Sequence, residues 1–206
     1  MSTFDNFYKK QGLYYGLAPS PYLEMLVKRE KMSKGYALDV GCGEGRNSIF
    51  LAENGFQVVA IDNSKEAILK LESISVEKKT SIKTILADVT KYKYEKEKYS
   101  IIVAETIIDH LEKEDGDNLI VNLISSLIQS GIIFISVFTV NDPGNTKKAV
   151  YSETAHFVKR YFLPGELRSK LSNLQLLRYH EEEFLDHNHG EPHYHVIARI
   201  IARVER

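Results

Sequence analysis

A short glycine-rich segment is the part of this 206-residue sequence best suited to hold a ligand. Gly41, Gly43 and Gly45 follow an apolar run and precede a stretch with helical character. Glycines allow positive φ and close approach of the backbone, and a helix that begins there adds free N–H donors. Asp62 lies 21 residues after Gly41, at the end of the next apolar run, where a carboxylate can accept hydrogen bonds from a ribose diol. The combination indicates an adenosine-containing cofactor.

The spacing and charge of this loop favour one such cofactor over another. The glycines follow a G-x-G-x-G pattern rather than the G-x-G-x-x-G pattern that suits a pyrophosphate, and Asp39 precedes them. A carboxylate beside the loop would repel the phosphates of a dinucleotide but attract the ammonium group of an amino acid. S-adenosylmethionine is therefore the predicted cofactor, and an NAD-dependent oxidoreductase is the alternative enzyme.

The same residues resemble a known superfamily. Residues 38–45 (Leu-Asp-Val-Gly-Cys-Gly-Glu-Gly), with Asp62, resemble motifs I and II of class I S-adenosylmethionine-dependent methyltransferases. The triplet 87–89 resembles their adenine-contacting segment, and Glu105 falls where such enzymes line the cofactor pocket. Loop and resemblance together give a predicted set of cofactor contacts: Tyr15, Asp39, Gly41, Cys42, Gly43, Arg46, Asn47, Asp62, Asn63, Ala87, Asp88, Val89 and Glu105.

Three further segments narrow the resemblance to the tellurite-resistance (TehB-like) branch. Residues 45–52 and 15–20 are similar to that branch, as is the terminal run 197–203. The resemblance implies a Rossmann-like methyltransferase fold, with a seven-stranded, mostly parallel sheet, an antiparallel last strand and helices on both faces. It also implies methyl transfer to a small molecule, for some members tellurite or a related oxyanion. Residues 186–195 contain histidines and no arginine, so a thiol is as consistent an acceptor as a tellurium or selenium oxyanion.

The histidines are gathered near the end of the chain. Six of the seven lie at or beyond His156. His193 and His195 are two apart on a predicted strand and so share a face, while His187 and His189 occupy the adjoining turn. Three interpretations stay open: a metal site completed by Asp186, proton acceptors lining a substrate pocket, and a solvated hairpin.

An aromatic N-terminal stretch is a candidate lid. Residues 4–22 contain six phenylalanine or tyrosine side chains, and either Tyr15 or Tyr8 could exclude water from the cofactor. Simple packing of this segment on the core is the alternative. No catalytic base is assigned, because a soft thiol, selenium or tellurium nucleophile can react without a dedicated base, whereas a hydroxyl or amine acceptor more often needs one. The candidates for a catalytic role are Tyr15, His110, His193 and His195.

The elements that must position these residues alternate in type, as in an α/β fold. Apolar runs predict strands, and a 3.6-residue period or helix-capping residues predict helices. The predicted strands are 36–40, 56–61, 82–87, 99–104, 132–140, 174–184 and 193–204. The predicted helices are 46–54, one capped by Asn63, 112–129 with Gly131 as its stop, and 164–171 opened by Pro164. The polar stretch 141–160 is predicted to be a long loop.

No linker divides the sequence, so we expect one domain over 1–206. Within it, residues 1–34 form a lid or helix segment, 35–140 the cofactor-binding half, and 141–206 the substrate-side loop and C-terminal hairpin.

With 27 Lys+Arg against 28 Asp+Glu, the chain is not suited to coating nucleic acid or an anionic membrane. The lone Cys42 excludes an intrachain disulfide framework, and with no apolar leader we expect a cytoplasmic protein. The non-enzymatic alternative is an adenosine-ligand or metal-binding module; the oligomeric state is not predicted.

Overall fold

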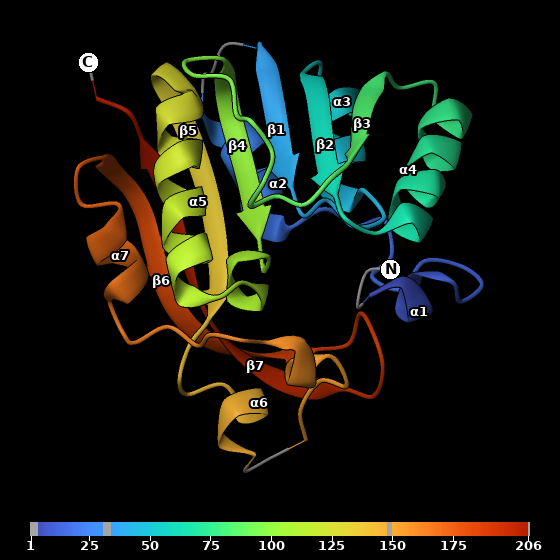
Figure 1. Cartoon of the computed structure of the whole chain (residues 1–206), viewed down its shortest axis with the longest axis vertical. Helices are drawn as coiled ribbons and strands as arrows, with labels where there is room; N and C mark the ends of the chain where they lie inside the picture. Colours follow the sequence, from blue (N-terminus) through green and yellow to red (C-terminus); the bar gives the residue numbers. More distant parts are fainter. Residues whose placement is uncertain (1–3, 31–33, 148–149, 206) are drawn as a thin grey trace.

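Seven strands form one sheet in the computed structural model, which describes residues 4–30, 34–147 and 150–205. The strand order is β3-β2-β1-β4-β5-β7-β6 (Figure 1). Strands β1 to β5 are parallel, whereas β7 runs antiparallel to both of its neighbours, β5 and β6. The bounds are β1 Tyr36–Val40, β2 Gln57–Asp62, β3 Ile82–Leu86, β4 Tyr99–Glu105, β5 Leu127–Phe138, β6 Gln175–Asp186 and β7 His193–Arg203. The predicted seven-stranded, mostly parallel sheet with an antiparallel last strand is confirmed.

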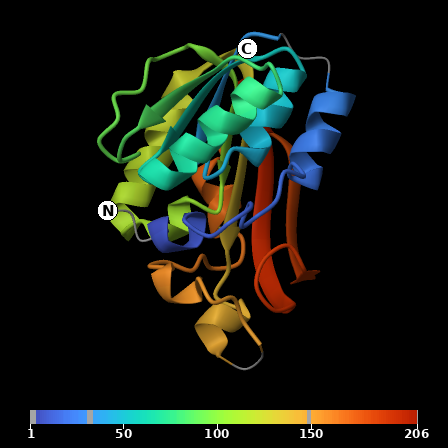
Figure 2. The ribbon, with the colours of Figure 1, turned by 90° about the vertical axis from the view of Figure 1, so that its right-hand side faces the viewer.

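Helices cover both faces of the sheet (Figure 2). One face packs on α2 (Pro21–Arg29), α3 (Arg46–Glu53) and α4 (Lys65–Glu77) through a cluster that includes Leu23, Leu51 and Leu71. The other face packs on α5 (Lys113–Ser126) and α7 (Glu166–Lys170) through Leu123 and Leu167. The inner strands are buried on both sides, which explains their almost continuous apolar sequences. None of the helices in the described part of the chain is long and apolar enough to cross a membrane.

The strand order reverses direction at β1, which pairs with β2 on one side and β4 on the other. The carboxyl ends of β1, β2 and β4 point toward the N-terminal segment with α1 (Asp5–Tyr8) and toward the segment with α6 (Pro143–Thr146) (Figure 1). In open α/β sheets ligands bind at such a reversal, outside the carboxyl ends of the strands. The glycine loop follows β1, so the fold places it there.

The boundary between α5 and β5 differs from the sequence prediction. The helical stripe continues through Leu127 and Ile128, but α5 ends at Ser126. Leu127 pairs with Tyr99 of β4, and Ser130 then adopts a φ of 63° before the regular strand resumes. Gly131 is part of this strand and does not stop a helix; a Cβ there would lie 3.0 Å from the Tyr99 carbonyl oxygen. Strand pairing thus outweighs helical periodicity at this point.

Three smaller predictions are corrected. Ser64 caps α4 in place of Asn63, because its hydroxyl accepts from the N–H of Ala67 at 3.2 Å. Helix α7 begins after Gly165 at Glu166, so Pro164 precedes the helix. The stretch 141–160 is not loop throughout: it holds α6 and a 3₁₀ turn, η2 (Ala155–Phe157).

Candidate functional site

A pocket with about 1120 Å³ of empty space, part of it open to solvent, lies at the carboxyl ends of β1, β2 and β4. All but one of the predicted cofactor contacts line it: Tyr15, Asp39, Gly41, Cys42, Gly43, Arg46, Asn47, Asp62, Asn63, Asp88, Val89 and Glu105. Ala87 is the exception; it packs against the core, and its N–H donates to the Asp62 carbonyl.

The glycine loop depends on its missing side chains at two points. Gly41 has a φ of 68°, and a Cβ there would lie 2.6 Å from Cγ1 of Ile107. Gly45 has a φ of 90°, and a Cβ there would lie 2.2 Å from Cδ1 of Leu71. Both positions combine a left-handed backbone with close approach, which only glycine accommodates without strain. The loop therefore leads into α3 with its backbone close to the floor of the pocket.

Asp62 links β2 to this loop. Its Oδ2 accepts from the N–H of Gly43 at 2.8 Å, and its Oδ1 accepts from the N–H of Ser64 at 2.8 Å. Burial raises the pKa of Asp62, although these N–H donors oppose the shift. Each carboxylate oxygen has two acceptor sites. Asp62 can therefore hold the loop and still accept further hydrogen bonds from a ligand.

Arg46, Asn47 and Glu105 form a polar cluster between α3 and the end of β4. The Glu105 carboxylate accepts from the Arg46 guanidinium and from the Asn47 amide, each at 2.9 Å. Burial would raise the pKa of Glu105, but the Arg46 charge and these hydrogen bonds outweigh it, so the pKa lies below the usual value. Glu105 is therefore an anion at neutral pH, paired with a cation at the pocket wall.

Asp39 is the least hydrated acid of the pocket. Its residue is 2% exposed, and its Oδ2 accepts from the Ser48 hydroxyl at 2.6 Å. Burial raises the pKa of Asp39 to about 7, against the opposing effect of Ser48. A cation placed beside this carboxyl would favour its ionised form. Burial also raises the pKa of the neighbouring Cys42 thiol. The thiol therefore stays protonated, which does not suit a nucleophile.

Aromatic side chains from the N-terminal segment cover the loop. Tyr8 is buried, its hydroxyl lies 3.0 Å from where a Cβ of Gly43 would stand, and its ring centroid is 6.4 Å from that of Tyr15. Phe4, Tyr8 and Tyr15 all line the pocket. The segment that was predicted as a lid therefore forms one wall of the site.

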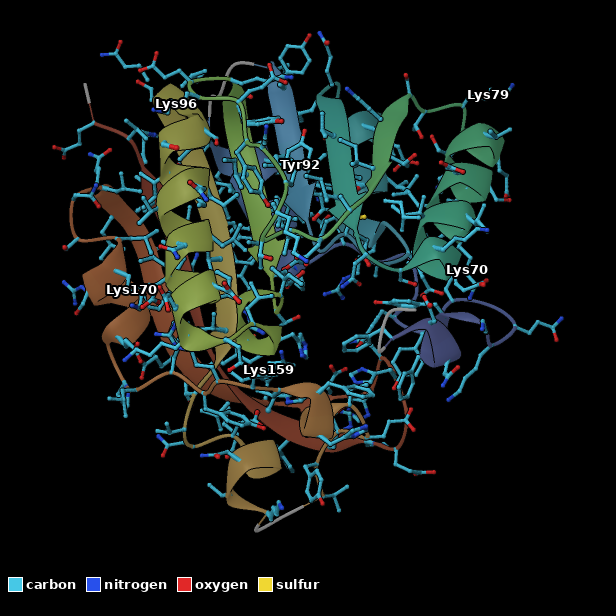
Figure 3. All side chains as sticks on the ribbon, in the orientation of Figure 1. Lys70, Lys79, Tyr92, Lys96, Lys159 and Lys170 are labelled. Atoms are coloured by element: carbon cyan, nitrogen blue, oxygen red, sulfur yellow. The ribbon has the colours of Figure 1, made fainter. Side chains whose placement is uncertain are left out.

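Polar contacts hold this segment in place. Lys70, at the lower end of α4 in Figure 3, donates to the carbonyls of Lys10 and Gly12 at 2.9 and 2.6 Å. It also pairs with Glu44 of the glycine loop at 2.8 Å. Glu44 in turn accepts from the N–H of Tyr14 at 2.7 Å. The N-terminal segment is thus connected to the cofactor loop by charge-assisted hydrogen bonds.

The segment 141–160 meets the N-terminal segment on the other side of the pocket. The Phe157 ring lies 5.1 Å from Phe4 and 5.9 Å from Phe7, between centroids. The Phe157 carbonyl lies 3.1 Å from Nδ1 of His110. A carbonyl can only accept, so the proton of the neutral imidazole is on Nδ1 and Nε2 keeps a lone pair. Burial lowers the pKa of His110, which keeps this pocket-lining ring neutral.

The C-terminal histidines form a separate cluster. His189, His193 and His195 are buried, Asp186 beside them is partly buried, and none of the four lines the pocket. The cluster touches the site through Tyr15, whose ring centroid lies 4.8 Å from that of His189. The grouping of His187 with these residues is wrong, because His187 points to solvent and is not part of the cluster.

Several pocket residues were not predicted as cofactor contacts. They are Phe4, Tyr8, Gly16, Glu44, Gly45, Thr106, Ile107, His110 and Leu111. Thr106 and Ile107 directly follow β4, so their place at the carboxyl end of a parallel strand was a usable signal. Glu44 lies within the glycine motif itself. Phe4 and Tyr8 reach the pocket only through tertiary packing of a segment far from the motif.

Comparison with known protein families gives one match over most of the chain. The family model described as "Tellurite resistance protein TehB" matches residues 5–193. A curated relative, "Probable S-adenosyl-L-methionine-dependent methyltransferase TehB" of Haemophilus influenzae, is 31% identical over 86 residues, 42% of this chain and 30% of that protein. The "Ubiquinone biosynthesis O-methyltransferase" of Rickettsia typhi is 33% identical over 134 residues, 62% of this chain and 50% of that protein. The chain thus matches half or less of the length of these two relatives.

A solved structure has the same fold. The crystal structure of TehB from Haemophilus influenzae is similar with a TM-score of 0.76 and 20% sequence identity. The similarity covers 98% of this chain and 66% of that chain. At this identity the likeness concerns the arrangement of strands and helices, including the antiparallel last strand.

Proposed function

The chain belongs to the family of the tellurite resistance protein TehB, and from this premise we propose that it transfers a methyl group from S-adenosylmethionine to a small molecule. The observation that carries the proposal is the pocket at the glycine loop, where backbone amides, Asp39, Asp62 and Glu105 surround one space. The activity in the printed name of the Haemophilus influenzae relative supports the same conclusion.

The charge of the pocket suits this cofactor. The lining residues include five carboxylates and one guanidinium: Asp39, Glu44, Asp62, Asp88, Glu105 and Arg46. S-adenosylmethionine carries a sulfonium and an ammonium against one carboxylate, so it has a net positive charge. A nicotinamide dinucleotide carries a negatively charged pyrophosphate, which this pocket would repel. The acidic lining therefore favours S-adenosylmethionine over NAD.

Individual pocket residues match the chemical groups of S-adenosylmethionine. We assign the ribose diol to Asp62, because its oxygens retain acceptor sites. We assign the adenine to the end of β3, where Asp88 and Val89 line the pocket. The ammonium group belongs near Asp39 and Glu105, and the carboxylate near Arg46. When bound, the cofactor supplies a methyl group already activated by its sulfonium sulfur.

The chain's own contribution is to position the reactants and exclude water. Tyr8 and Tyr15 cover the loop, and the Glu44–Lys70 pair holds their segment in place. Where the acceptor must lose a proton, we assign the proton acceptor to Nε2 of His110, the only imidazole among the described residues that line the pocket. His193 and His195 do not line the pocket.

The same charge distribution bears on the acceptor. Arg46, the only guanidinium in the described lining, is already paired with Glu105. An oxyanion such as tellurite would meet an excess of carboxylates, and no further arginine supplies a bidentate contact. A thiol needs neither an arginine nor a strong base, because Nε2 of His110 can take its proton and the resulting thiolate is a good soft nucleophile. We therefore propose a small thiol as the preferred acceptor, ahead of a tellurium or selenium oxyanion.

Calorimetry with S-adenosylmethionine, S-adenosylhomocysteine and NAD tests the cofactor. We expect the two sulfur ligands to bind and NAD not to bind, and Asp62→Ala to weaken both sulfur ligands. Glu77→Gln is the matched control, because Glu77 is an exposed acid at the far end of α4. Binding of NAD alone would overturn the proposal.

An acceptor screen tests the reaction. Release of S-adenosylhomocysteine is measured with a panel of small thiols, with tellurite and with selenite. Turnover with thiols and none with the oxyanions is the expected result. Turnover with tellurite alone would overturn the acceptor assignment, while absence of turnover with any acceptor would favour an adenosine-ligand module.

A further inference from the structure

The tip of the β6–β7 hairpin brings three imidazoles and a carboxylate to one point. Asp186 ends β6, His189 lies in the turn, and His193 and His195 alternate along β7 on one face. One potential ligand atom from each of the four lies within 4.8 Å of all the others. The three histidines are only 8%, 2% and 4% exposed. Buried imidazoles at this density need partners that satisfy their ring nitrogens.

The hydrogen bonds of two of these rings fix where their lone pairs point. Nδ1 of His193 lies 2.6 Å from the Glu191 carbonyl oxygen, and Nδ1 of His195 lies 3.0 Å from Oδ2 of Asp142. Carbonyl and carboxylate oxygens only accept, so both Nδ1 atoms carry hydrogen. In neutral rings both Nε2 atoms therefore hold lone pairs, yet they face each other at 3.0 Å. Such an arrangement requires a cation shared between the two nitrogens.

The third histidine and the carboxylate supply two further potential ligand atoms. Nε2 of His189 lies 3.2 Å from the Ser152 hydroxyl, whereas its Nδ1 is buried and has no hydrogen-bond partner among the described residues. Oδ1 of Asp186 accepts from the backbone and side chain of Asn188. Oδ2 of Asp186 is turned the other way, 3.6 Å from the unsatisfied Nδ1 of His189. A single proton between the two Nε2 atoms would leave the buried Nδ1 of His189 without a hydrogen-bond partner.

We propose that the four residues bind one divalent transition metal of the zinc class. The ligand atoms are Oδ2 of Asp186, Nδ1 of His189, and Nε2 of His193 and His195. Zn–N bonds of about 2.0–2.1 Å in a tetrahedral site place two nitrogens about 3.3 Å apart. The observed 3.0 Å between the two Nε2 atoms is close to this value. Imidazole and carboxylate are suitable zinc ligands, and four protein ligands make a closed site.

The outer contacts are those that metal-binding histidines generally have. Asp142 orients His195, the Glu191 carbonyl orients His193, and Ser152 faces His189. Such partners fix the tautomer and raise the basicity of the ligand nitrogen. Asp142 and Ser152 come from the segment 141–160, so the metal would fasten this segment to the hairpin. His189 also contacts Tyr15 at the pocket wall. The site therefore stabilises the acceptor side of the pocket, independently of any cofactor.

Metal content and metal titration of the full chain, purified without an affinity tag, test the proposal. We expect about one zinc ion per chain after dialysis without chelator, and a lower melting temperature after chelation that added Zn²⁺ restores. Co²⁺ in place of zinc should give the strong visible absorption of a tetrahedral site. His195→Ala and Asp186→Asn should each lose the metal. Asp142→Asn should weaken it by about 10–100-fold, as expected for an outer partner.

His187→Ala is the matched control, because His187 lies in the same turn and points to solvent. It should bind Zn²⁺ and Co²⁺ as the wild type does. Circular dichroism shows whether each variant folds. A folded wild type that neither retains zinc nor binds Co²⁺ would overturn the proposal, and so would equal losses in the His187 and His195 variants. Because no S-adenosylmethionine is present, these outcomes do not depend on the proposed methyl transfer.

Discussion

Lys70 on α4 and Glu44 in the glycine loop form an ion pair at 2.8 Å, and both also hold the backbone of the N-terminal segment. The Glu44 side chain is 2% exposed and that of Lys70 is 25% exposed, so water screens this pair little. One interaction therefore joins the glycine loop to the N-terminal segment that covers it.

Replacement of Lys70 should loosen this cover. Lys70→Met leaves the Glu44 charge buried without its partner, and we expect the free energy of unfolding to fall by about 3 kcal/mol. Hydrogen exchange in residues 5–16 should accelerate, and S-adenosylmethionine should bind more weakly. Lys78→Met is the control, since Lys78 pairs with Glu53 on the surface and should cost less than about 1 kcal/mol. Equal losses in the two variants would contradict the special role of Lys70.

Tyr15 tests whether the aromatic cover acts as a lid. Tyr15→Ala removes a ring that lines the pocket, and we expect the Kd for S-adenosylmethionine to rise about tenfold, equivalent to about 1.4 kcal/mol of lost apolar contact. Turnover should fall as well. Tyr15→Phe keeps the ring and should retain affinity near that of the wild type. Calorimetry and initial rates measure both effects, and unchanged affinity and turnover in Tyr15→Ala would refute the lid.

The strands and helices that could be predicted are those whose sequence pattern has a local cause. A strand buried on both faces is mostly apolar, so β1, β4 and most of β5 are visible in the sequence. The end of α5 is not, because Leu127 and Ile128 suit the helical stripe equally well. Only pairing with Tyr99, on a strand formed elsewhere in the chain, ends the helix at Ser126.

In the candidate site, too, the residues that a local sequence pattern indicates could be predicted and the others could not. The glycine loop and Asp62 are predictable because one motif and the next strand carry them. The outer partner of His195 is Asp142, 53 residues earlier in the chain, and no local spacing indicates it. Likewise, the turn sequence does not distinguish His187 from His189; the hairpin geometry buries His189 and exposes His187. Residues brought together by tertiary packing were therefore those that the sequence could not assign.

Asp39 should make stability depend on pH. Its pKa is about 7 in the folded chain, against 3.8 for an ordinary carboxyl. The folded state therefore binds this proton more tightly than the unfolded chain does. The protonated Asp39 contributes its full stabilisation of the fold below about pH 4, and this contribution is lost as the pH rises through about 7. Relative to Asp39→Asn, the free energy of unfolding of the wild type should fall by up to about 4 kcal/mol over this range. Urea unfolding of both proteins across the range measures the difference, and a constant difference would contradict it.

Cofactor binding should show the opposite trend at the same residue. An ammonium group beside Asp39 favours the carboxylate, so the affinity for S-adenosylmethionine should increase as the pH rises through about 7. Asp39→Asn removes the titrating group and keeps an oxygen that can accept from Ser48. This variant should therefore bind more weakly and lose most of the increase, as calorimetry at several pH values would show. An equal increase in both proteins would place the titrating group elsewhere.

A comparison of Gly45 with Gly55 distinguishes the backbone strain of a side chain at positive φ from its steric overlap with neighbouring atoms. Their φ values are similar, 90° and 87°, but a Cβ at Gly45 would lie 2.2 Å from Cδ1 of Leu71, whereas a Cβ at Gly55 would meet nothing within 4 Å. Gly55→Ala should cost only the strain of a left-handed residue, about 1–2 kcal/mol. Gly45→Ala should cost about 1–3 kcal/mol more, because Leu71 must move in a packed core. Urea unfolding measures both values. Helix α4 carries both Leu71 and Lys70, so a displacement of α4 should also weaken S-adenosylmethionine binding. We expect this weakening in Gly45→Ala and not in Gly55→Ala. Equal effects of the two substitutions on stability and affinity would contradict the prediction.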